Sequence, residues 1–266
     1  MTEQTPEAIL YHGEPNGPSL SVLAALAESG LDIECRPIDL LAGERHALPG
    51  ISDGVAMEYA VEGEGPVLVA GGEAMSEAVF LAQYFDEAVC GCGLQPADPY
   101  KRWQMLMWCR QAIERLSPAV AYLGNLAYSQ HPLAELDKPA FDALLAAIAS
   151  EDLRQRWQDL HDDRVDAAKV EDSKTKVTQF AERVEMQLSD GRPWLMEDFS
   201  IADLETFAWL RPMRDLEAAA FAGKNRCIAW MDRVEARPSV QSALARATTE
   251  HPERKFAPGP EINRWG

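Results

Sequence analysis

A stretch rich in glycine and proline, between Gly91 and Pro99, divides this 266-residue chain into two unlike halves. Before it, short apolar runs alternate with helical patterns in the order strand, helix, strand, helix, strand, strand, helix. After it, every periodic segment is helical. The sequence therefore predicts an α/β domain over residues 7–89 and an all-α domain over residues 98–266 that ends in an extended tail.

The first half carries its strands and helices between clear turn signals. Ser19 is expected to be the N-cap of a first helix that ends at Gly30. A weak helix is expected before residue 57, and a further helix is expected to begin at Ser76. Pro66 opens a short β-branched strand, where its missing N–H costs no ladder bond. Strands are expected at residues 8–11, 31–38 and 67–69, with a fourth after the turn at Gly71 and Gly72.

The second half is predicted to contain helices alone. Ser200 and Asp203 precede the apolar run LETFAWL and form the pattern of a capping box. Pro238 follows what is expected to be the last helix, and the proline-interrupted residues from His251 onward are expected to be extended. Helices are expected over residues 101–122, 141–160, 174–188 and 227–235.

Charge and cysteine content exclude several classes of function. The formal net charge is −18, which disfavours nucleic acid and anionic membranes as partners. No apolar run is long enough to cross a bilayer, and the first residues lack the pattern of a secretory signal. Five scattered cysteines indicate reduced thiols and a cytoplasmic location. Cys90 and Cys92 have no second Cys or His pair nearby, so we expect no metal site.

Four pieces of the chain, in this order, resemble glutathione S-transferases over almost its whole length. They are the Gly65–Pro66 step, residues 94–102, the Ser200–Asp203 capping box and residues 230–238. Three stretches, LYHGEPNGPSL near the start, PADPYKR and WMDRVEARP, are more specifically similar to bacterial glutathione-dependent β-aryl etherases. The resemblance implies a thioredoxin-like fold in which Pro66 is cis. It also implies that a glutathione thiolate attacks the ether-bearing carbon of a two-ring β-aryloxy ketone, so that a phenolate leaves.

A thiolate needs a donor or dipole that lowers its pKa, and a helix N-terminus supplies one. Asn16 or Ser19, at the start of the first helix, is therefore the expected catalytic donor, although Ser19 is equally well explained as a helix cap. The resemblance assigns the glutathione backbone to Gly65 beside Pro66. It assigns the γ-glutamyl group to the helix start at Ser76–Glu77, and the glycyl carboxylate to Arg45 or His46.

The expected carboxylate end of the site departs from the family pattern. The family has an acidic residue or Gln followed by Ser, and we read Ser76–Glu77 as the reverse order. Glu62 and Glu64 add negative charge beside Pro66, and like charges repel anionic glutathione. We therefore expect this chain to bind glutathione weakly on its own and to act in a heterodimer.

Aromatic residues of the helical half are candidates for the pocket that takes the aromatic ether, although aromatic residues at helical spacing are more often plain core. The candidates are His12, Trp108, Tyr122, Asn125, Tyr128 and Trp209. Two alternatives to a β-etherase subunit stay open: a non-catalytic partner that has lost its own glutathione site, and a general detoxifying glutathione transferase of the same fold.

Overall fold

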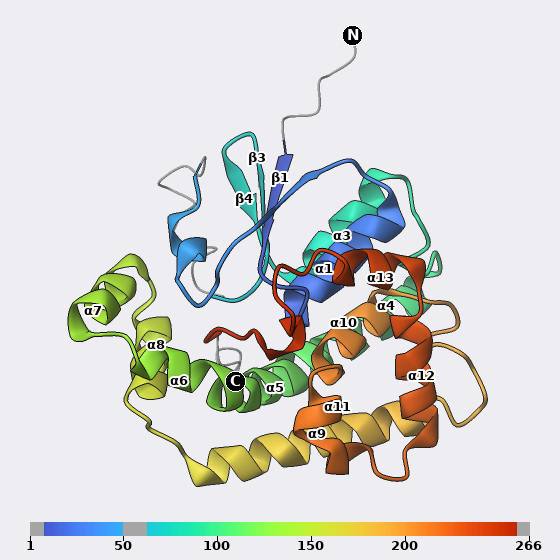
Figure 1. The fold of residues 1–266 in the computed structure, drawn as a ribbon. Coiled ribbons are helices and arrows are strands. Elements are labelled where there is room, and N and C mark those ends of the chain that lie inside the picture. The colour runs from blue at the N-terminus through green and yellow to red at the C-terminus, as the bar shows by residue number, and fades with distance from the viewer. Residues whose placement is uncertain (1–7, 50–62, 260–266) are drawn as a thin grey trace.

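We analysed a computed structural model of the chain, which describes residues 8–49 and 63–259. A four-stranded sheet with the order β2-β1-β3-β4 forms the upper part of the molecule in Figure 1. β1 (Ala8–His12) pairs in parallel with β2 (Glu34–Pro37) and antiparallel with β3 (Val67–Ala70). β4 (Glu73–Met75) follows β3 through Gly71 and Gly72, whose positive φ values of 62° and 85° suit a two-residue hairpin turn.

Two helices cover one face of this sheet and join it to the helical domain. α1 (Gly17–Ser29) and α3 (Ala78–Ala88) pack against each other, and α1 also packs against α10 (Ile201–Leu210) and α13 (Pro238–Leu244). Leu10 of β1 and Leu68 of β3 are fully buried in the same apolar core as these helices. One continuous core therefore fixes the sheet on the helical domain.

The helical domain begins with an almost unbroken helical run. α4 (Pro99–Gln111), α5 (Ser117–Gly124) and α6 (Gln130–Ala134) are joined by π-helical turns at Ala112–Leu116 and Asn125–Ser129. Each π-helical turn precedes a helix that carries a proline near its start, Pro118 and Pro132, where the regular hydrogen-bond ladder cannot continue.

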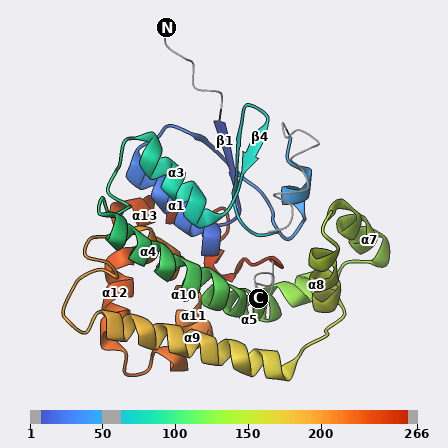
Figure 2. The same ribbon diagram turned by 180° about the vertical axis from the view of Figure 1, so that it is seen from behind.

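The other helices complete the domain around α10. α7 (Lys138–Ala147) and α8 (Glu151–His161) form an arm beside α6, and α9 (Ala167–Gln187) runs along the bottom of the molecule in Figure 2. Every residue of α10 is buried, and a reciprocal capping box between Ser200 and Asp203 begins it. α11 (Met213–Leu216), a 3₁₀ turn at Ala218–Phe221 and α12 (Asn225–Glu235) follow. Within the part that the structure describes, no helix is long and apolar enough to cross a membrane.

The tail crosses back over the molecule after α13. A 3₁₀ turn at Pro252–Arg254 leads into extended residues 255–259, which we call the strap. In Figure 1 this dark red segment runs between the sheet domain and α5. Ala257 of the strap is fully buried in a second apolar cluster that also holds Leu153 and Trp157 of α8. The strap is therefore packed into the fold rather than lying loosely on its surface.

Several predicted element boundaries are wrong. α1 begins at Gly17 with Asn16 at the N-cap position, and α3 begins at Ala78, so neither Ser19 nor Ser76 starts its helix. The helix expected over residues 141–160 is the separate helices α7 and α8, because Ile148 leaves the helical conformation with ψ at 111°. Pro238 does not follow the last helix but begins another, α13, since proline is favourable in a first turn. The weak helix expected before residue 57 is a 3₁₀ turn at Glu44–Ala47, and its later part lies outside the described residues.

The expectation of a cis bond before Pro66 is also wrong. No peptide bond is cis anywhere in residues 8–49 and 63–259, so the Gly65–Pro66 bond is trans. The trans form is the more stable one for an X–Pro bond by about 0.5–1 kcal/mol. Here the Gly65 carbonyl oxygen accepts a hydrogen bond from Arg45 Nε at 2.6 Å, which satisfies it inside the protein.

Candidate functional site

Strand pairing gathers four of the predicted segments at one edge of the sheet. Tyr11 pairs with Val67, so the turn after β1 lies beside the residues that enter β3. The last residue of β2 pairs with His12 of β1. Met75, the last residue of β4, pairs with the residue of β3 that follows Val67. The turn after β1, the loop after β2, the Gly65–Pro66 step and the start of α3 therefore meet at this edge.

Asn16 and Ser19 have different surroundings in the turn after β1. Ser19 Oγ accepts a hydrogen bond from Gly13 N at 3.0 Å, so the serine stabilises the turn itself. Asn16 makes no capping bond to α1, and its Nδ2 donates to the Lys255 carbonyl oxygen of the strap at 3.0 Å. Both side chains are buried, and of the two it is the Asn16 amide that donates to the strap.

His12 lies inside the protein rather than at the mouth of a pocket. Its side chain is 2% exposed, and Nδ1 lies 2.7 Å from the Gly13 carbonyl oxygen, a contact in which the ring nitrogen donates. Burial, chiefly, lowers its pKa, with a further contribution from the cation of Arg246. A neutral His12 therefore orients the backbone of the turn.

Arg45 and His46 follow β2, as predicted, but neither presents a cation to solvent. Arg45 is fully buried, and its Nε bonds the Gly65 carbonyl oxygen. Burial, and secondarily the charge of Arg45, lowers the pKa of His46 to about 4. At neutral pH His46 is therefore uncharged, so of these two residues it is Arg45 that carries a positive charge.

The start of α3 differs from our interpretation of the dipeptide Ser76–Glu77. Glu77 is the residue immediately before the helix and has φ 69° and ψ 112°, a rare conformation for a residue with a side chain. Glu77 is thus the acidic residue of the family pattern, and the residue after it, where the family has Ser, is Ala78, which has no hydroxyl group. Strained backbone of this kind costs of order 1–3 kcal/mol and gathers at ligand sites.

The strap passes beside this edge of the sheet. Its carbonyl groups accept hydrogen bonds from side chains of both domains: Asn16 Nδ2 to Lys255 O at 3.0 Å, Ser129 Oγ to Phe256 O at 2.8 Å, Asn125 Nδ2 to Ala257 O at 3.2 Å and Arg156 Nη1 to Gly259 O. At its far end, a Cβ added to Gly63 would lie 2.8 Å from the Pro258 carbonyl oxygen. The strap therefore runs from the turn after β1 to the residues that enter β3.

Close contacts hold both ends of the strap in place. The Phe256 ring stacks on Tyr128 with a centroid distance of 6.3 Å, and a Cβ on Gly124 would lie 2.5 Å from that ring. A Cβ on Gly259 would lie 2.5 Å from the side chain of Glu64, whereas Glu62 is outside the described residues. Glycine at 124 thus makes the room for the phenylalanine.

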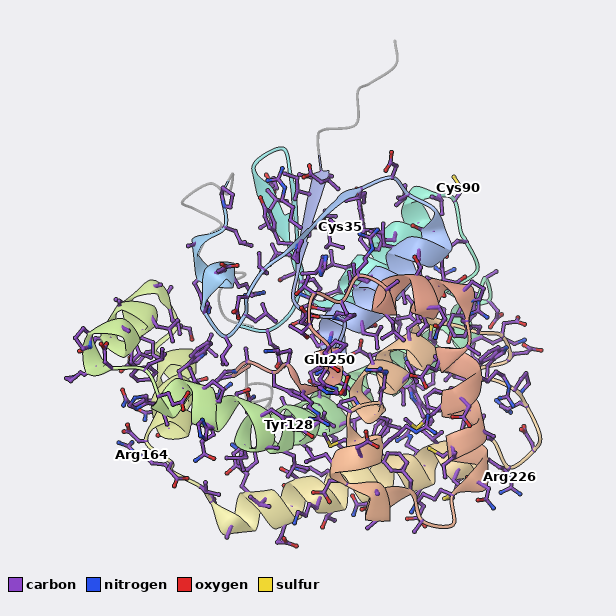
Figure 3. All side chains as sticks on the ribbon, in the orientation of Figure 1. Cys35, Cys90, Tyr128, Arg164, Arg226 and Glu250 are labelled. Carbon is purple, nitrogen blue, oxygen red and sulfur yellow. The ribbon has the colours of Figure 1, made fainter. Side chains whose placement is uncertain are left out.

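Of the five predicted pocket residues other than His12, three come together and two do not. Tyr122, Asn125 and Tyr128 lie on one helical run beside the strap, and Figure 3 labels Tyr128 in the region where the strap crosses. Trp108 instead donates from Nε1 to Thr206 Oγ1 at 2.9 Å and packs edge-on against Phe180 of α9.

Trp209 is also core, although it supports the site. Its ring lies beneath Gly17, where an added Cβ would be 3.3 Å away. Its Nε1 donates to Glu205 Oε1 at 2.9 Å, and burial raises the pKa of that carboxyl group. Trp209 therefore supports the start of α1 from below.

Sequence reasoning missed the residues that form the strap and its anchors. Phe256, Ser129 and Arg156 contact the site but carry no motif, and the tail gave only a pattern of prolines. An aromatic residue in a mostly polar stretch, Phe256, was an available signal. Within the described part of the chain, no cluster of His, Cys, Asp and Glu side chains has the arrangement of a metal site.

Comparison with known proteins identifies relatives over most of the chain, although the sequence matches no protein-family profile. LigF of Sphingobium sp. strain SYK-6 is 24% identical over 253 residues, which cover 91% of this chain and 94% of LigF. The crystal structure of LigF, described as a β-etherase, superposes with a TM-score of 0.78 at 23% identity over 91% of this chain and 100% of that one.

Two further relatives are glutathione transferases. Glutathione S-transferase F14 of Arabidopsis thaliana is 26% identical over 226 residues, 82% of this chain and 76% of that protein. A Pseudomonas putida glutathione transferase, solved with glutathione disulfide bound, has a TM-score of 0.60 at 21% identity over 92% of this chain and 94% of that one. The chain thus has the glutathione S-transferase fold, and its sequence is similar to a β-etherase and to a glutathione S-transferase over most of its length.

Proposed function

We propose that the chain is a glutathione-dependent β-aryl etherase subunit, with residues 7–89 as its glutathione domain and residues 98–266 as its substrate domain. The observation that carries this is the meeting of four separate segments at one sheet edge, in a chain that is similar to LigF over 91% of its length. In the reaction, the glutathione sulfur forms a bond to the carbon that bears the ether. The C–O bond breaks, and its electron pair leaves with the phenolate.

Asn16 is our candidate for the group that stabilises the thiolate. Its side-chain amide faces the strap rather than the helix, and the N-terminus of the 13-residue α1 adds a favourable dipole at the same place. Ser19 Oγ accepts a hydrogen bond from Gly13 N, and this structural role in the turn is the one that we propose for it. We therefore expect Asn16→Ala to lower kcat, and Ser19→Ala to act mainly through stability.

Glu77 is our candidate for the ammonium of the γ-glutamyl group. Glutathione carries an ammonium and a carboxylate on the same carbon at this end, so an acidic residue can bind one of them while backbone N–H groups of α3 bind the other. Ala78 supplies no hydroxyl to that carboxylate. The loss of one hydrogen bond to a charged group, about 1.5–3 kcal/mol, favours weak rather than absent binding.

Glutathione reaches Asn16 only when the strap is displaced. The Lys255 carbonyl oxygen accepts from Asn16 Nδ2, and the Phe256 ring fills the space between Gly124 and Tyr128. Both groups lie where a thiolate and an aromatic ring would have to meet. The closed strap is therefore the resting form of the proposed enzyme.

A second transferase-like chain is the partner that we propose. Four large side chains on α3 and α4 are exposed although they are aromatic, and Figure 2 shows both helices on the near side. They are Phe80, Tyr84, Tyr100 and Trp103, with exposed fractions of 64%, 42%, 65% and 54%. An aromatic surface of this kind is typical of a protein interface. We favour a heterodimer with a site-competent chain in the cytoplasm, where the five free thiols stay reduced.

Calorimetric titration of glutathione into the purified chain tests the proposal, together with an assay of phenol release from a β-O-4 dimer. We expect weak binding by the chain alone, and turnover that rises when a site-competent transferase chain is added. Turnover of the β-O-4 dimer by the chain alone, with tight glutathione binding, would exclude the need for a partner. No turnover in either arm, with no glutathione binding, would support the alternative of a non-catalytic subunit. Turnover of simple electrophiles but not of the ether would support a general transferase.

A further inference from the structure

A small cavity of about 160 Å³ lies between α9 and the helical run that begins the second domain. Its lining consists of Gln111, Arg115, Lys176, Gln179, Phe180 and Arg183. None of the described residues in this lining is acidic, although the whole chain carries −18. Figure 2 shows α9 along the bottom of the molecule and the sheet at the top, and no lining residue belongs to the sheet edge described above.

Two helical segments bring the polar side chains of this cavity together. Lys176, Gln179 and Arg183 are three and four residues apart on α9, a spacing that places them on one helical face. Arg115 comes from the π-helical turn at Ala112–Leu116, where the regular ladder is interrupted. Single π-helical turns inside helices are frequent at functional sites.

The two arginines of the cavity are available to a ligand. Arg115 is exposed and Arg183 is partly exposed, and neither guanidinium forms a hydrogen bond or ion pair with any residue that the structure describes. The side-chain amides of Gln111 and Gln179 are likewise unengaged within those residues. Lys176 differs, because it pairs with an aspartate one turn earlier on α9. The cavity therefore offers two arginines and two amides as free donors.

Packing holds Arg183 in place without neutralising it. Its guanidinium lies 4.4 Å from the centroid of the Trp108 ring, and that ring is fixed by its bond to Thr206. Burial lowers the pKa of Arg183, and the cation of Arg115 lowers it further. Within residues 8–49 and 63–259, no carboxylate opposes this shift. The two arginines thus repel each other, and an anion bound between them would relieve the repulsion.

We propose that this cavity binds the phosphate group of a small molecule, with Arg115 and Arg183 as its main donors and Lys176 as a further positive charge. Guanidinium N–H groups match phosphate oxygens in pairs, which makes arginine a preferred partner of phosphate. The volume lies below the range of about 300–1,000 Å³ that is usual for whole ligands, so it suits a compact anionic group. The remainder of a phosphate ester would lie in the adjoining groove, which shares Gln179 and Arg183 and is also lined by Met186.

Calorimetric titration of the full-length chain with inorganic phosphate and with phenyl phosphate tests the site, at about pH 8, where a phosphate group is doubly charged. Arg115→Met and Arg183→Met should each weaken phosphate binding roughly tenfold or more, because each removes a charge-assisted pair. Lys174→Met is the matched control on α9. It removes one positive charge that pairs with Glu171 outside the cavity, and it should change the affinity by less than about twofold.

The two probes distinguish the two sources of a phosphate group. Tighter binding of phenyl phosphate would support an ester that also uses the adjoining groove, and equal binding would support the free ion. Failure of both probes to bind to a chain that circular dichroism shows to be folded would overturn the proposal. So would equal losses of affinity in Arg183→Met and Lys174→Met.

The thermal stability of the chain separates ligand binding from a structural role of the arginines. Because Arg115 and Arg183 repel each other, Arg115→Met should not lower the melting temperature measured without phosphate. Phosphate should raise the melting temperature of the wild type and of Lys174→Met, but not that of Arg115→Met. A lower melting temperature of Arg115→Met without phosphate would assign the arginine a structural role and overturn the proposal. None of these measurements involves glutathione, so their outcome is independent of the proposed function.

Discussion

Replacing Phe256 with alanine tests whether the strap and glutathione compete for one place. The ring is 6% exposed, stacks on Tyr128 and occupies the space left by Gly124. Complete burial of a phenylalanine side chain contributes about 1.5–3 kcal/mol. Phe256→Ala should therefore shift the closing equilibrium of the strap by roughly 10- to 150-fold towards the open form, at 1.4 kcal/mol for each factor of ten.

The apparent dissociation constant of glutathione should fall by up to that factor, because it equals the intrinsic constant divided by the open fraction. Calorimetric titration of wild type and variant measures it. Ser129→Ala removes only the bond to the Phe256 carbonyl oxygen, about 0.5–1.5 kcal/mol, and should give a smaller change of about 2- to 12-fold in the same direction. Phe80→Ala, on exposed α3 surface, is the control without effect on binding. A dissociation constant that stays constant or rises in Phe256→Ala would refute competition and make the strap part of the binding site.

Three further changes test other parts of the argument. Asp203→Ala should destabilise the fold by roughly 3 kcal/mol or more in urea unfolding, because it leaves three buried N–H donors without an acceptor, and glutathione affinity of the folded fraction should not change. Trp103→Glu should shift the sedimentation coefficient towards monomer, since it puts a charge on the proposed interface, whereas a distant exposed Val165→Glu should not. The free energy of unfolding should decrease as the pH falls from about 6.5 towards 4, since burial disfavours protonated His46, whose pKa is lowered to about 4. His46→Phe should reduce this pH dependence, and an unchanged dependence would contradict the assignment.

The arrangement of the site was predictable to the extent that it depends on local pattern. Alternating strands and turn residues locate the segments after β1, β2 and β4 and before β3, and the sheet order then brings them together. The capping box at Ser200 was predictable for the same reason, because it is a four-residue pattern with its own physical mechanism. Helix boundaries were less predictable because a serine can cap a helix or, as Ser19 does, accept from a preceding loop N–H.

The strap was not predictable because its contacts are non-local. Asn16 and Lys255 are 239 residues apart, and nothing in either neighbourhood indicates the other. The isomer of the Gly65–Pro66 bond is a comparable case. Its trans form agrees with the hydrogen bond from Arg45, a partner 20 residues earlier, which the local sequence does not indicate.

The strap and glutathione are chemically alike, so under the proposed function one site would suit both. An extended peptide offers a row of carbonyl groups, and side-chain donors from both domains bind four of those of the strap. Glutathione is also a short extended peptide, but it brings anionic ends to a chain with a net charge of −18, whereas Lys255 beside the site brings a cation. Long-range charge therefore favours the strap, and salt should screen this preference. Since the strap is tethered, its effective concentration is fixed, and only differences in contacts decide how much glutathione displaces it.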